Sequence, residues 1–480
     1  MSKYDVVIGL EVHVKIKTES KMFCSCPNKY GAEPNTLVCP VCMGHPGVLP
    51  VPNREAIRKT VLAGLMTECE IAEFSKFDRK SYFYPDMPKN YQISQYDLPF
   101  CSSGKIRISG KGFSGEPLPE KTIGITRIHL EEDVAKSTHF GGYSGIDFNR
   151  AGGPLMEIVS EPDMESADEA YAYLSELKQI MQYAGISSCD MEKGELRCDV
   201  NISLKPAGRK EFGTKIEIKN LNSFRAIHRA ICYEISRQAA ELDAGAELQQ
   251  ETRGWNDDKG LTYLMRVKES ESDYRYFPEP DLMPVTFTQD DIEKIRKTMP
   301  ETPQAKRKRF VDEYSIPAYD AEVLTQDKDI ADFFDTAAGK NAKSAKLLAN
   351  WIISELLREL SDAGISIAEC MITPDSLAEL VALIEKGTIS GKIAKTVFAE
   401  MFKTGEKPAV IVEEKGLVQV SDSSEIEKFV DQAIEENQPQ VQQYRDGNEK
   451  VLQYFVGQVM KLSRGKANPQ MVIKLLKEKL

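Results

Sequence analysis

Two pairs of cysteines near the amino terminus have the spacing of a metal site. Cys24 and Cys26 form a Cys-x-Cys pair, and Cys39 and Cys42 form a Cys-x-x-Cys pair after twelve intervening residues. Four thiolates can bind Zn²⁺ tetrahedrally at about 2.3 Å, which leaves no position open for water. The spacing therefore predicts a structural zinc site. The alternative is four reduced cysteines that hold no metal.

Acidic residues within apolar, strand-like stretches form a second group that could do chemistry. In Val6–Lys15, Glu11 and His13 alternate with apolar residues, as in a half-buried strand. A carboxylate in an apolar strand is costly to bury unless it is paired or bound to a metal. Four further strand-like segments carry acids in the same way. One contains Glu131 and, on the opposite parity, Glu132, and the other three contain Glu157, Asp199 and Glu217. We expect the polar faces of these strands to converge. The alternative for Glu11 and His13 is a solvated strand face.

Basic residues accompany these acids. Lys80, Arg150, Arg197 and Lys219 lie in or beside the same kind of segment. Carboxylates with one histidine favour Mg²⁺ or Mn²⁺, and added lysine and arginine favour phosphate. The combination predicts a pocket for a metal ion and a nucleotide.

Common nucleotide and hydrolase motifs do not account for this pocket. The sequence has no Gly-x-Gly-x-x-Gly and no Gly-x-Ser-x-Gly motif. Gly387–Ile393 is similar to a phosphate-binding loop, but its glycine spacing is one residue short. Ile393 also stands where a serine or threonine would bind Mg²⁺.

The periodicity of the chain changes along its length. Short alternating segments dominate residues 1–289, interrupted by helical stretches at Asn53–Met66 and Ala167–Ala184. Residues 290–402 have helical periodicity, Lys403–Val410 has the composition of a linker, and residues 403–480 form a small helical tail. We therefore predict an α+β protein with a large β-rich domain, a helical domain and a tail domain.

Bulk properties are those of an ordinary globular protein. The chain has 480 residues, a net charge of −12 and ten cysteines. No apolar run has the length of a membrane span, and the amino terminus lacks a signal peptide. We therefore expect a cytoplasmic protein with reduced thiols and no membrane contact.

Seven long motifs of the chain resemble those of a known family. They are IGLEVHV, SKFDRKSYFYPDMPKNYQISQYD, IGITRIHLEED, EIVSEPD, LRCDVNIS, EIKNLNSF and DYRYFPEPDL. Together, and in the family's order, they resemble the B subunit of the aspartyl/glutamyl-tRNA amidotransferase. The resemblance covers essentially the whole chain.

The resemblance implies an ATP-dependent carbon–nitrogen ligase that takes its amide nitrogen from glutamine. The chain would bind misacylated Asp-tRNA(Asn) or Glu-tRNA(Gln) and phosphorylate the side-chain carboxylate with ATP and Mg²⁺. Ammonia from an amidase (A) subunit would then displace the phosphate. The implied partners also include a small C subunit and a non-discriminating aminoacyl-tRNA synthetase. The implied fold is a β-rich cradle, a helical domain and a tail that binds tRNA.

The family's motifs also imply the site residues. Glu11 and His13 match the Glu-Val-His motif, Lys80 the Asp-Arg-Lys motif, and Glu132 the second acid of Glu-Glu-Asp. The implied catalytic residues are Lys80 and a set that would also bind Mg²⁺: Glu11, His13, Glu132, Glu157, Asp199 and Glu217. The implied phosphate contacts are Lys80, Arg150, Lys219 and Arg253.

Some positions depart from the family's pattern. Gly254 stands where the family usually has a second arginine, which puts the role of Arg253 in doubt. Glu195 and Val200 replace the usual small residues of their strand. The four-cysteine pattern occurs in only part of the family, which favours a structural zinc over a catalytic one.

The end of the tail is basic although the whole chain is acidic. Residues 461–480 contain six basic residues and one acid, a formal charge of +5. Phosphate contacts require such a local patch. The predicted tRNA-binding residues are Lys461, Arg464, Lys466, Lys474 and Lys477, the alternative being an ordinary solvated helix.

Two other functions fit part of the sequence. One is a tRNA-binding or assembly factor that has lost the chemistry. The retention of four residues argues against it: Glu11, His13, Lys80 and Glu132. The other is a stand-alone metal-dependent phosphotransferase that acts on a small carboxylate, which the basic tail and the lack of an ammonia source in this sequence argue against. The sequence does not decide between Asp-tRNA and Glu-tRNA as the substrate.

Overall fold

The computed structural model describes residues 3–267, 274–418, 423–463 and 467–480. The chain divides into two compact units, Met1–Pro303 and Gln304–Leu480. The first unit contains the strands and the second is helical, so the protein has the predicted α+β composition. We describe each unit by itself.

A nine-stranded sheet organises the first unit. Its strand order is β14-β13-β12-β11-β1-β10-β7-β6-β2, and all neighbours are antiparallel except the parallel pair β12 and β13. The strands are β1 (Tyr4–Lys15), β2 (Glu70–Ile71), β6 (Cys101–Lys111), β7 (Pro117–Glu132), β10 (Pro154–Ser160), β11 (Leu196–Pro206), β12 (Ile216–Lys219), β13 (Glu251–Asn256) and β14 (Leu261–Val267). Each alternating segment predicted from the sequence contributes a strand to this sheet.

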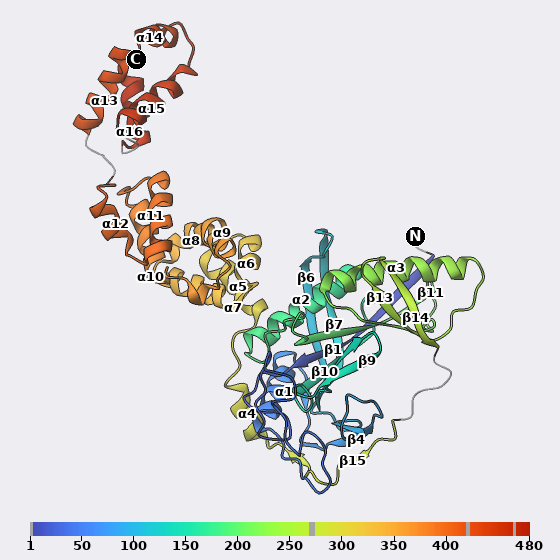
Figure 1. Ribbon diagram of the computed structural model, residues 1–480. Helices are drawn as coiled ribbons and strands as arrows, with labels where there is room; N and C mark the ends of the chain where they lie inside the picture. The colour runs from blue at the N-terminus through green and yellow to red at the C-terminus, as the bar shows by residue number, and fades with distance from the viewer. Residues whose placement is uncertain (1–2, 268–273, 419–422, 464–466) are drawn as a thin grey trace. The chain divides into compact units, whose positions relative to one another are not determined.

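Three helices cover one face of the sheet. They are α1 (Arg54–Met66), α2 (Ala167–Tyr183) and α3 (Phe224–Asp243), and Figure 1 shows α2 and α3 lying along the sheet. Leu10, Val12 and Val14 of β1 are buried in the core that these helices share. Because side chains alternate across a strand, the intervening Glu11 and His13 face the other side of the sheet.

The helix α3 was missed, because only two helices were predicted in this region. Its first turn is capped by Ser223, whose side chain accepts a hydrogen bond from the amide of Ala226. The strand ends at Lys219, and Asn220 has a left-handed backbone with φ of 64°, so the chain turns there before the helix begins.

Small sheets complete the first unit. The strand order β15-β4-β5 forms a three-stranded sheet, β8 pairs with β9, and β16 pairs with β3. These strands are β3 (Phe74–Ser75), β4 (Asp78–Ser81), β5 (Tyr91–Ser94), β8 (Lys136–Phe140), β9 (Tyr143–Asp147), β15 (Phe277–Pro278) and β16 (Val285–Thr286). The helix α4 (Gln289–Arg296) also belongs here, because its Ile292 packs on Val61 and Leu65 of α1. The first unit therefore ends one helix beyond the boundary predicted at residue 289.

The second unit is helical throughout its described length. Its α-helices are α5 (Pro303–Tyr314), α6 (Ala318–Leu324), α7 (Lys328–Ala338), α8 (Ala345–Trp351), α9 (Leu357–Ala363), α10 (Pro374–Glu385), α11 (Gly391–Thr404), α12 (Pro408–Glu414), α13 (Ser423–Glu436), α14 (Gln438–Arg445), α15 (Val451–Leu462) and α16 (Pro469–Lys479). Short turns of other helix types lie at Ala342–Ser344, Ile352–Leu356 and Ile367–Glu369. None of the helices in the described parts of the chain is long and apolar enough to cross a membrane.

The linker predicted at Lys403–Val410 is wrong. This segment contains the end of α11 and the start of α12, and α12 packs against α10 and α11. Ile411 and Val412 of α12 are buried, which a linker would not achieve. Pro408 misled the composition argument, since proline also favours the first turn of a helix. Beyond it, α13 to α16 bury an apolar cluster of their own.

Candidate active site

The polar face of the large sheet lines a cavity of roughly 550 Å³. The large sheet supplies one wall, and the other comes from β4, β5 and the residues that follow them, together with Tyr274 and Tyr276. The lining includes seven of the predicted site residues, namely Glu11, His13, Lys80, Glu157, Asp199, Glu217 and Lys219. The predicted convergence of polar strand faces therefore exists for these seven.

A first cluster joins His13, Glu131 and Glu157. The register of three neighbouring strands places His13 beside Glu157, and Glu157 beside His129. The Nε2 atom of His13 lies 3.3 Å from Oε2 of Glu157 and 3.7 Å from Oε1 of Glu131. One ligand atom from each of the three lies within 4.8 Å of the others, so a single cation could contact all three.

The electrostatics of this cluster keep its acids ionised. Burial alone would raise the pKa of Glu157, but the charges of His129, His13 and Lys80 hold that pKa well below its usual range. In turn, burial would lower the pKa of His13, and the hydrogen bond and charge of Glu157 raise it above its usual value. An ionised carboxylate pair with an imidazole is a donor set that fits Mg²⁺ or Mn²⁺.

A second cluster joins Glu11, Asp199 and Glu217, again with one oxygen of each within 4.8 Å of the others. Lys219 lies 2.6 Å from Asp199 and 2.8 Å from Glu217, and Asn201 donates a hydrogen bond of 2.8 Å to Glu11. Burial would lower the pKa of Lys219, but the two acids raise it, so the lysine stays charged. Three carboxylates around one lysine leave an excess of negative charge, which fits a second cation.

Cations line the rest of the cavity. Burial would lower the pKa of Lys80, yet the charges of Glu131, Tyr276 and Glu157 raise it, and its Nζ lies 4.8 Å from the ring centre of Tyr274. The other basic lining residues, apart from Lys219, are Arg127, Lys215, Arg197 and Arg266. Cations beside metal-binding carboxylates are the arrangement that phosphoryl groups require.

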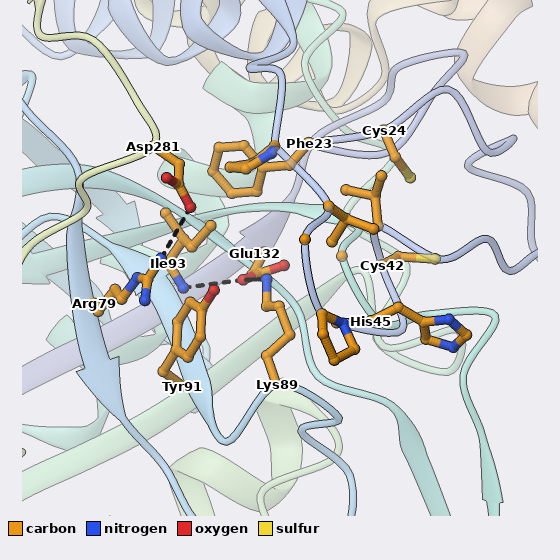
Figure 2. Close-up of a pocket in the computed structure, with 17 residues that line it drawn as sticks. Phe23, Cys24, Cys42, His45, Arg79, Lys89, Tyr91, Ile93, Glu132 and Asp281 are labelled. Carbon is orange, nitrogen blue, oxygen red and sulfur yellow. Dashed lines mark hydrogen bonds and ion pairs between the residues drawn. The ribbon is translucent and has the colours of Figure 1, made fainter.

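The structure does not bring Glu132 to this cavity. Glu132 follows Glu131 in β7 and therefore points to the opposite face of the strand. Its carboxylate is paired with Lys89 and accepts a hydrogen bond of 3.0 Å from the amide of Ile93. Figure 2 shows Glu132 beside Lys89, in a separate cavity that Cys24 and Cys42 also line. Glu131, rather than the predicted Glu132, lines the cavity of the polar sheet face.

Two predicted phosphate contacts also lie elsewhere. Arg150 donates hydrogen bonds of 2.9 and 2.8 Å to the carbonyls of Val134 and Ala135. Arg253 lies 2.7 Å from the carboxylate of Glu251 and 3.3 Å from that of the fully buried Glu234. The positive charge of Arg253 is thus already neutralised, and we leave both arginines out of the proposed site.

Several lining residues were not selected from the sequence as site residues. They are Arg127, His129, Glu131, Lys215, Arg266, Tyr274 and Tyr276. A signal for the first three was present, because Arg127, His129 and Glu131 have the same parity in β7. Parity alone, applied without the family motif, would have chosen Glu131 over Glu132.

The four cysteines of the predicted zinc site come together. One sulfur from each of Cys24, Cys26, Cys39 and Cys42 lies within 4.8 Å of the others. Four sulfurs at about 2.3 Å from one ion lie ~3.8 Å apart, so small adjustments would give zinc geometry. Hydrogen bonding from Cys24 lowers the pKa of Cys42, and Lys21 supports the thiolate from 3.6 Å. The sulfur donors therefore fit Zn²⁺.

The tail presents its described lysines to solvent. Lys461 lies in the last turn of α15, Lys474 and Lys477 lie on α16, and all three are exposed. Val472 and Leu476 on the other side of α16 are buried in the cluster of α13 to α16. Of the other two predicted residues, Arg464 and Lys466 lie outside the residues that the structure describes.

Comparison with known proteins agrees with the sequence motifs. Residues 6–293 match the family model of the GatB/GatE catalytic domain, and residues 332–480 match that of the GatB domain. The chain is 54% identical over 479 residues to the B subunit of the aspartyl/glutamyl-tRNA(Asn/Gln) amidotransferase of Caldanaerobacter subterraneus, covering 100% of this chain and 99% of the relative.

Two further relatives carry the same name. The protein of Persephonella marina is 54% identical over 480 residues, with 100% of both chains covered. That of Carboxydothermus hydrogenoformans is 53% identical over 485 residues, with 100% of this chain and 99% of the relative covered. With both family models matched and the relatives covered end to end, the chain belongs to the family formed by the B subunits of the aspartyl/glutamyl-tRNA(Asn/Gln) amidotransferases.

Proposed function

We propose that this chain activates the side-chain carboxylate of aspartate or glutamate attached to tRNA. A carboxylate oxygen attacks the γ-phosphorus of ATP, ADP leaves, and an acyl phosphate forms. Ammonia then attacks the carbonyl carbon, and inorganic phosphate departs to leave Asn-tRNA or Gln-tRNA. The observation that carries this proposal is the convergence of two carboxylate clusters and several cations in one cavity.

The acidic residues of the cavity would bind metal ions, and its basic residues would contact phosphate oxygens. His13, Glu131 and Glu157 would hold one Mg²⁺, and Glu11, Asp199 and Glu217 a second. When bound, Mg²⁺ would neutralise phosphate oxygens and fix their position. Lys80 and Lys219 would orient the remaining phosphate oxygens from opposite walls. Arg127 lies 3.8 Å from Glu157, which places a further cation beside the first cluster.

The proposal includes partners and a structural metal. Ammonia would come from an amidase subunit, and a small C subunit would complete the complex. A non-discriminating aminoacyl-tRNA synthetase would supply the misacylated tRNA. The four cysteines would hold a structural Zn²⁺, and the tail would bind tRNA through Lys461, Lys474 and Lys477.

The experiment uses two adjacent acids of β7 that face different cavities. Glu131→Gln should lower ATP-dependent phosphate release by at least ~10²-fold, because phosphoryl transfer depends on electrostatics and alignment. Glu132→Gln should retain most of the phosphate release, because its carboxylate faces away from the cavity. The assay uses the reconstituted complex, misacylated tRNA, and free ammonia in place of glutamine.

Free ammonia bypasses the amidase and isolates the step assigned to this chain. Formation of Gln-tRNA or Asn-tRNA is followed alongside phosphate release. If Glu131→Gln released phosphate as fast as the unmodified complex, the first cluster would not be the site of activation. An unmodified complex that never amidated either tRNA would overturn the proposed function as a whole.

A further inference from the structure

The three acids of the second carboxylate cluster repel one another. Glu11, Asp199 and Glu217 each place an oxygen within 4.8 Å of the others. Like charges at such a distance favour a carboxylate that turns away or takes up a proton. Glu217 is only 8% exposed, so it has little contact with water to stabilise its charge. Cation binding by this cluster therefore depends on partners that hold the carboxylates in place and ionised.

Two donors of different kinds hold Glu217. Lys219 lies 2.8 Å from its Oε1 atom, and the hydroxyl of Thr252 donates a hydrogen bond of 3.0 Å to its Oε2 atom. Lys219 is shared, since it also lies 2.6 Å from Asp199. The ammonium group of the lysine repels a metal cation, whereas the threonine hydroxyl carries no net charge. Of these two donors, Thr252 is the one that can keep its contact when a cation binds.

The register of three neighbouring strands places Thr252 beside Glu217. Glu217 on β12 lies opposite Thr252 on β13, and Thr252 lies opposite Arg266 on β14. Glu217 and Arg266 both line the cavity. Thr252 lies between them, is 2% exposed, and is not one of the described residues that line the cavity. Thr252 can therefore act on a bound ion only through its neighbours.

The contacts of Thr252 fix the direction of its hydroxyl group. The Nε atom of Arg266 donates a hydrogen bond of 3.4 Å to the Oγ1 atom of Thr252. An arginine only donates and an ionised carboxylate only accepts, so the hydroxyl accepts from Arg266 and donates to Glu217. A carboxylate has about four lone-pair positions, so one hydrogen bond does not prevent the same carboxylate from binding a metal ion.

We propose that Thr252 is a positioning residue of the second cation site. By holding Oε2 of Glu217, it keeps this carboxylate directed toward Glu11 and Asp199, so the three acids are arranged for a divalent cation before ATP binds. The inference rests on the proposed function, because it takes the second cluster to bind Mg²⁺. The first cluster lies on β1, β7 and β10, which do not adjoin β13 in the sheet, so its affinity should not depend on Thr252.

The first test measures binding of Mn²⁺ alone to the full-length chain, by calorimetry and electron paramagnetic resonance. Glu217→Gln and His13→Gln assign the sites, because each variant removes a ligand of one cluster. Thr252→Val removes the hydroxyl and keeps a branched side chain. It should weaken binding at the Glu217 site by about 10- to 100-fold, the usual effect of losing a donor to a metal ligand, and leave the His13 site unchanged. Thr252→Ser keeps the hydroxyl and should restore the affinity.

Thr262→Val is the matched control. Thr262 is a buried threonine of the neighbouring strand β14, but its hydroxyl contacts Glu234 of α3, on the helix side of the sheet. Its loss should lower thermal stability, because a buried acceptor loses its donor, without changing Mn²⁺ affinity at either site. An equal loss of affinity in Thr252→Val and Thr262→Val would count against the inference, since general loosening of the two strands would then explain both.

A second test uses the reconstituted complex with misacylated tRNA, ATP and free ammonia. Thr252→Val should release phosphate slowly at low Mg²⁺ and recover the rate of the unmodified complex at saturating Mg²⁺, because the variant weakens binding of the ion. A rate that saturating Mg²⁺ did not restore would overturn the positioning role, because the defect would then lie outside ion affinity.

The outcomes separate this inference from the proposed function. If the unmodified chain bound Mn²⁺ at both sites and Thr252→Val bound it equally well, the role of Thr252 would be disproved and the proposed function would stand. If Glu217→Gln removed no Mn²⁺ site, the second cluster would not bind a cation, and the inference would be wrong. An unmodified complex that amidated neither tRNA would overturn the proposed function, whereas the Mn²⁺ affinities would still decide the role of Thr252.

Discussion

The two adjacent glutamates of β7 differ in every contact that they make. Glu131 lies beside His13 and His129, whereas Glu132 pairs with Lys89 and the amide of Ile93. The alternation of side chains across a strand separates them, and no difference in residue type does. At this scale, the chemistry of a carboxylate is decided by the face of the sheet on which it lies.

His13 leads to a prediction about the pH dependence of metal binding. Its pKa is raised by Glu157 and Glu131 against the effect of burial, so the metal-free ring keeps a proton to higher pH than usual. A protonated imidazole cannot bind a cation, and metal binding must release the proton. Mg²⁺ affinity should therefore rise with pH up to the raised pKa of His13 and then level off. Calorimetric titration of Mg²⁺ between about pH 5.5 and pH 8.5 measures this.

Two histidine variants serve as the comparison. His13→Gln should weaken Mg²⁺ binding and remove its pH dependence. His139→Gln should change neither, because His139 is exposed on β8 and belongs to neither cluster. Affinity in the unmodified protein that is constant across the range, or that falls with rising pH, would contradict the role of His13 as a ligand.

At the scale of elements, the loop between β1 and α1 contains little regular structure. Near the cysteines its hydrogen bonds include local ones, such as those from Met43 to Cys39 and from Lys21 to Cys26, and Gly44 turns the chain with φ of 66°. Farther along, the amides of Asn35 and Leu37 donate to the side chains of Asp147 and Asn149. Few buried apolar side chains hold the segment between Cys26 and Cys42. A zinc ion bound by four thiolates would join the two ends of this weakly buried segment and so add a constraint to its hydrogen bonds.

We predict about one zinc ion per chain, held by this loop. Cys39→Ser should lower the zinc content and the thermal stability, because a structural metal contributes its binding free energy to folding. Cys232→Ser should change neither, since Cys232 is exposed on α3, far from the cluster in sequence. Elemental analysis and thermal unfolding measure both properties. Folded protein with reduced thiols and no zinc, purified without chelator, would disprove the site.

At the scale of the whole molecule, the two units differ in what they offer a substrate. The first unit holds the carboxylate clusters and the cavity that they line. The second unit, in its last helices, exposes Lys461, Lys474 and Lys477 without a carboxylate partner among the described residues. Lys479 is different, since it pairs with Glu427 and Asp431 at 2.7 and 2.5 Å. The proposed function therefore places activation in the first unit and the lysines of the tail, as an RNA-binding surface, in the second.

Removal of the last four helices should weaken tRNA binding but not folding of the rest. The chain should be ended after Leu417, because α12 packs on α10 and α11 and must be kept. Binding of unacylated tRNA should weaken, and its salt slope should fall by about 0.9 for each lost phosphate contact. Binding measurements at several salt concentrations check this.

The full-length variant Lys461→Ala/Lys474→Ala/Lys477→Ala provides the control for truncation. It should reproduce most of the loss in salt slope while keeping the buried cluster of α13 to α16 intact. Lys479→Ala should have a smaller effect, because that lysine already pairs with two acids. Unchanged affinity and salt slope in both the truncated and the triple variant would show that the tail does not bind RNA.

The local pattern of residue types determined those features of this protein that depend on residues close together in the sequence. The strand-like stretches with embedded acids predicted β1, β7, β10, β11 and β12, and the cysteine spacing predicted a four-sulfur cluster that the structure brings together. Apolar periodicity and a following glycine predicted α2, which ends before Gly185. These signals are reliable because the hydrogen bonds and side-chain directions of a strand or helix are set within a few residues.

Only the tertiary structure decided which of the polar residues meet. It put Glu131 in the cavity and Glu132 outside it, neutralised Arg253 with the buried Glu234, and packed the expected linker as α12. Such outcomes depend on strand register and on contacts between residues far apart in the chain. A local pattern cannot specify these, because the free energy that selects them comes from burial and pairing across the whole fold.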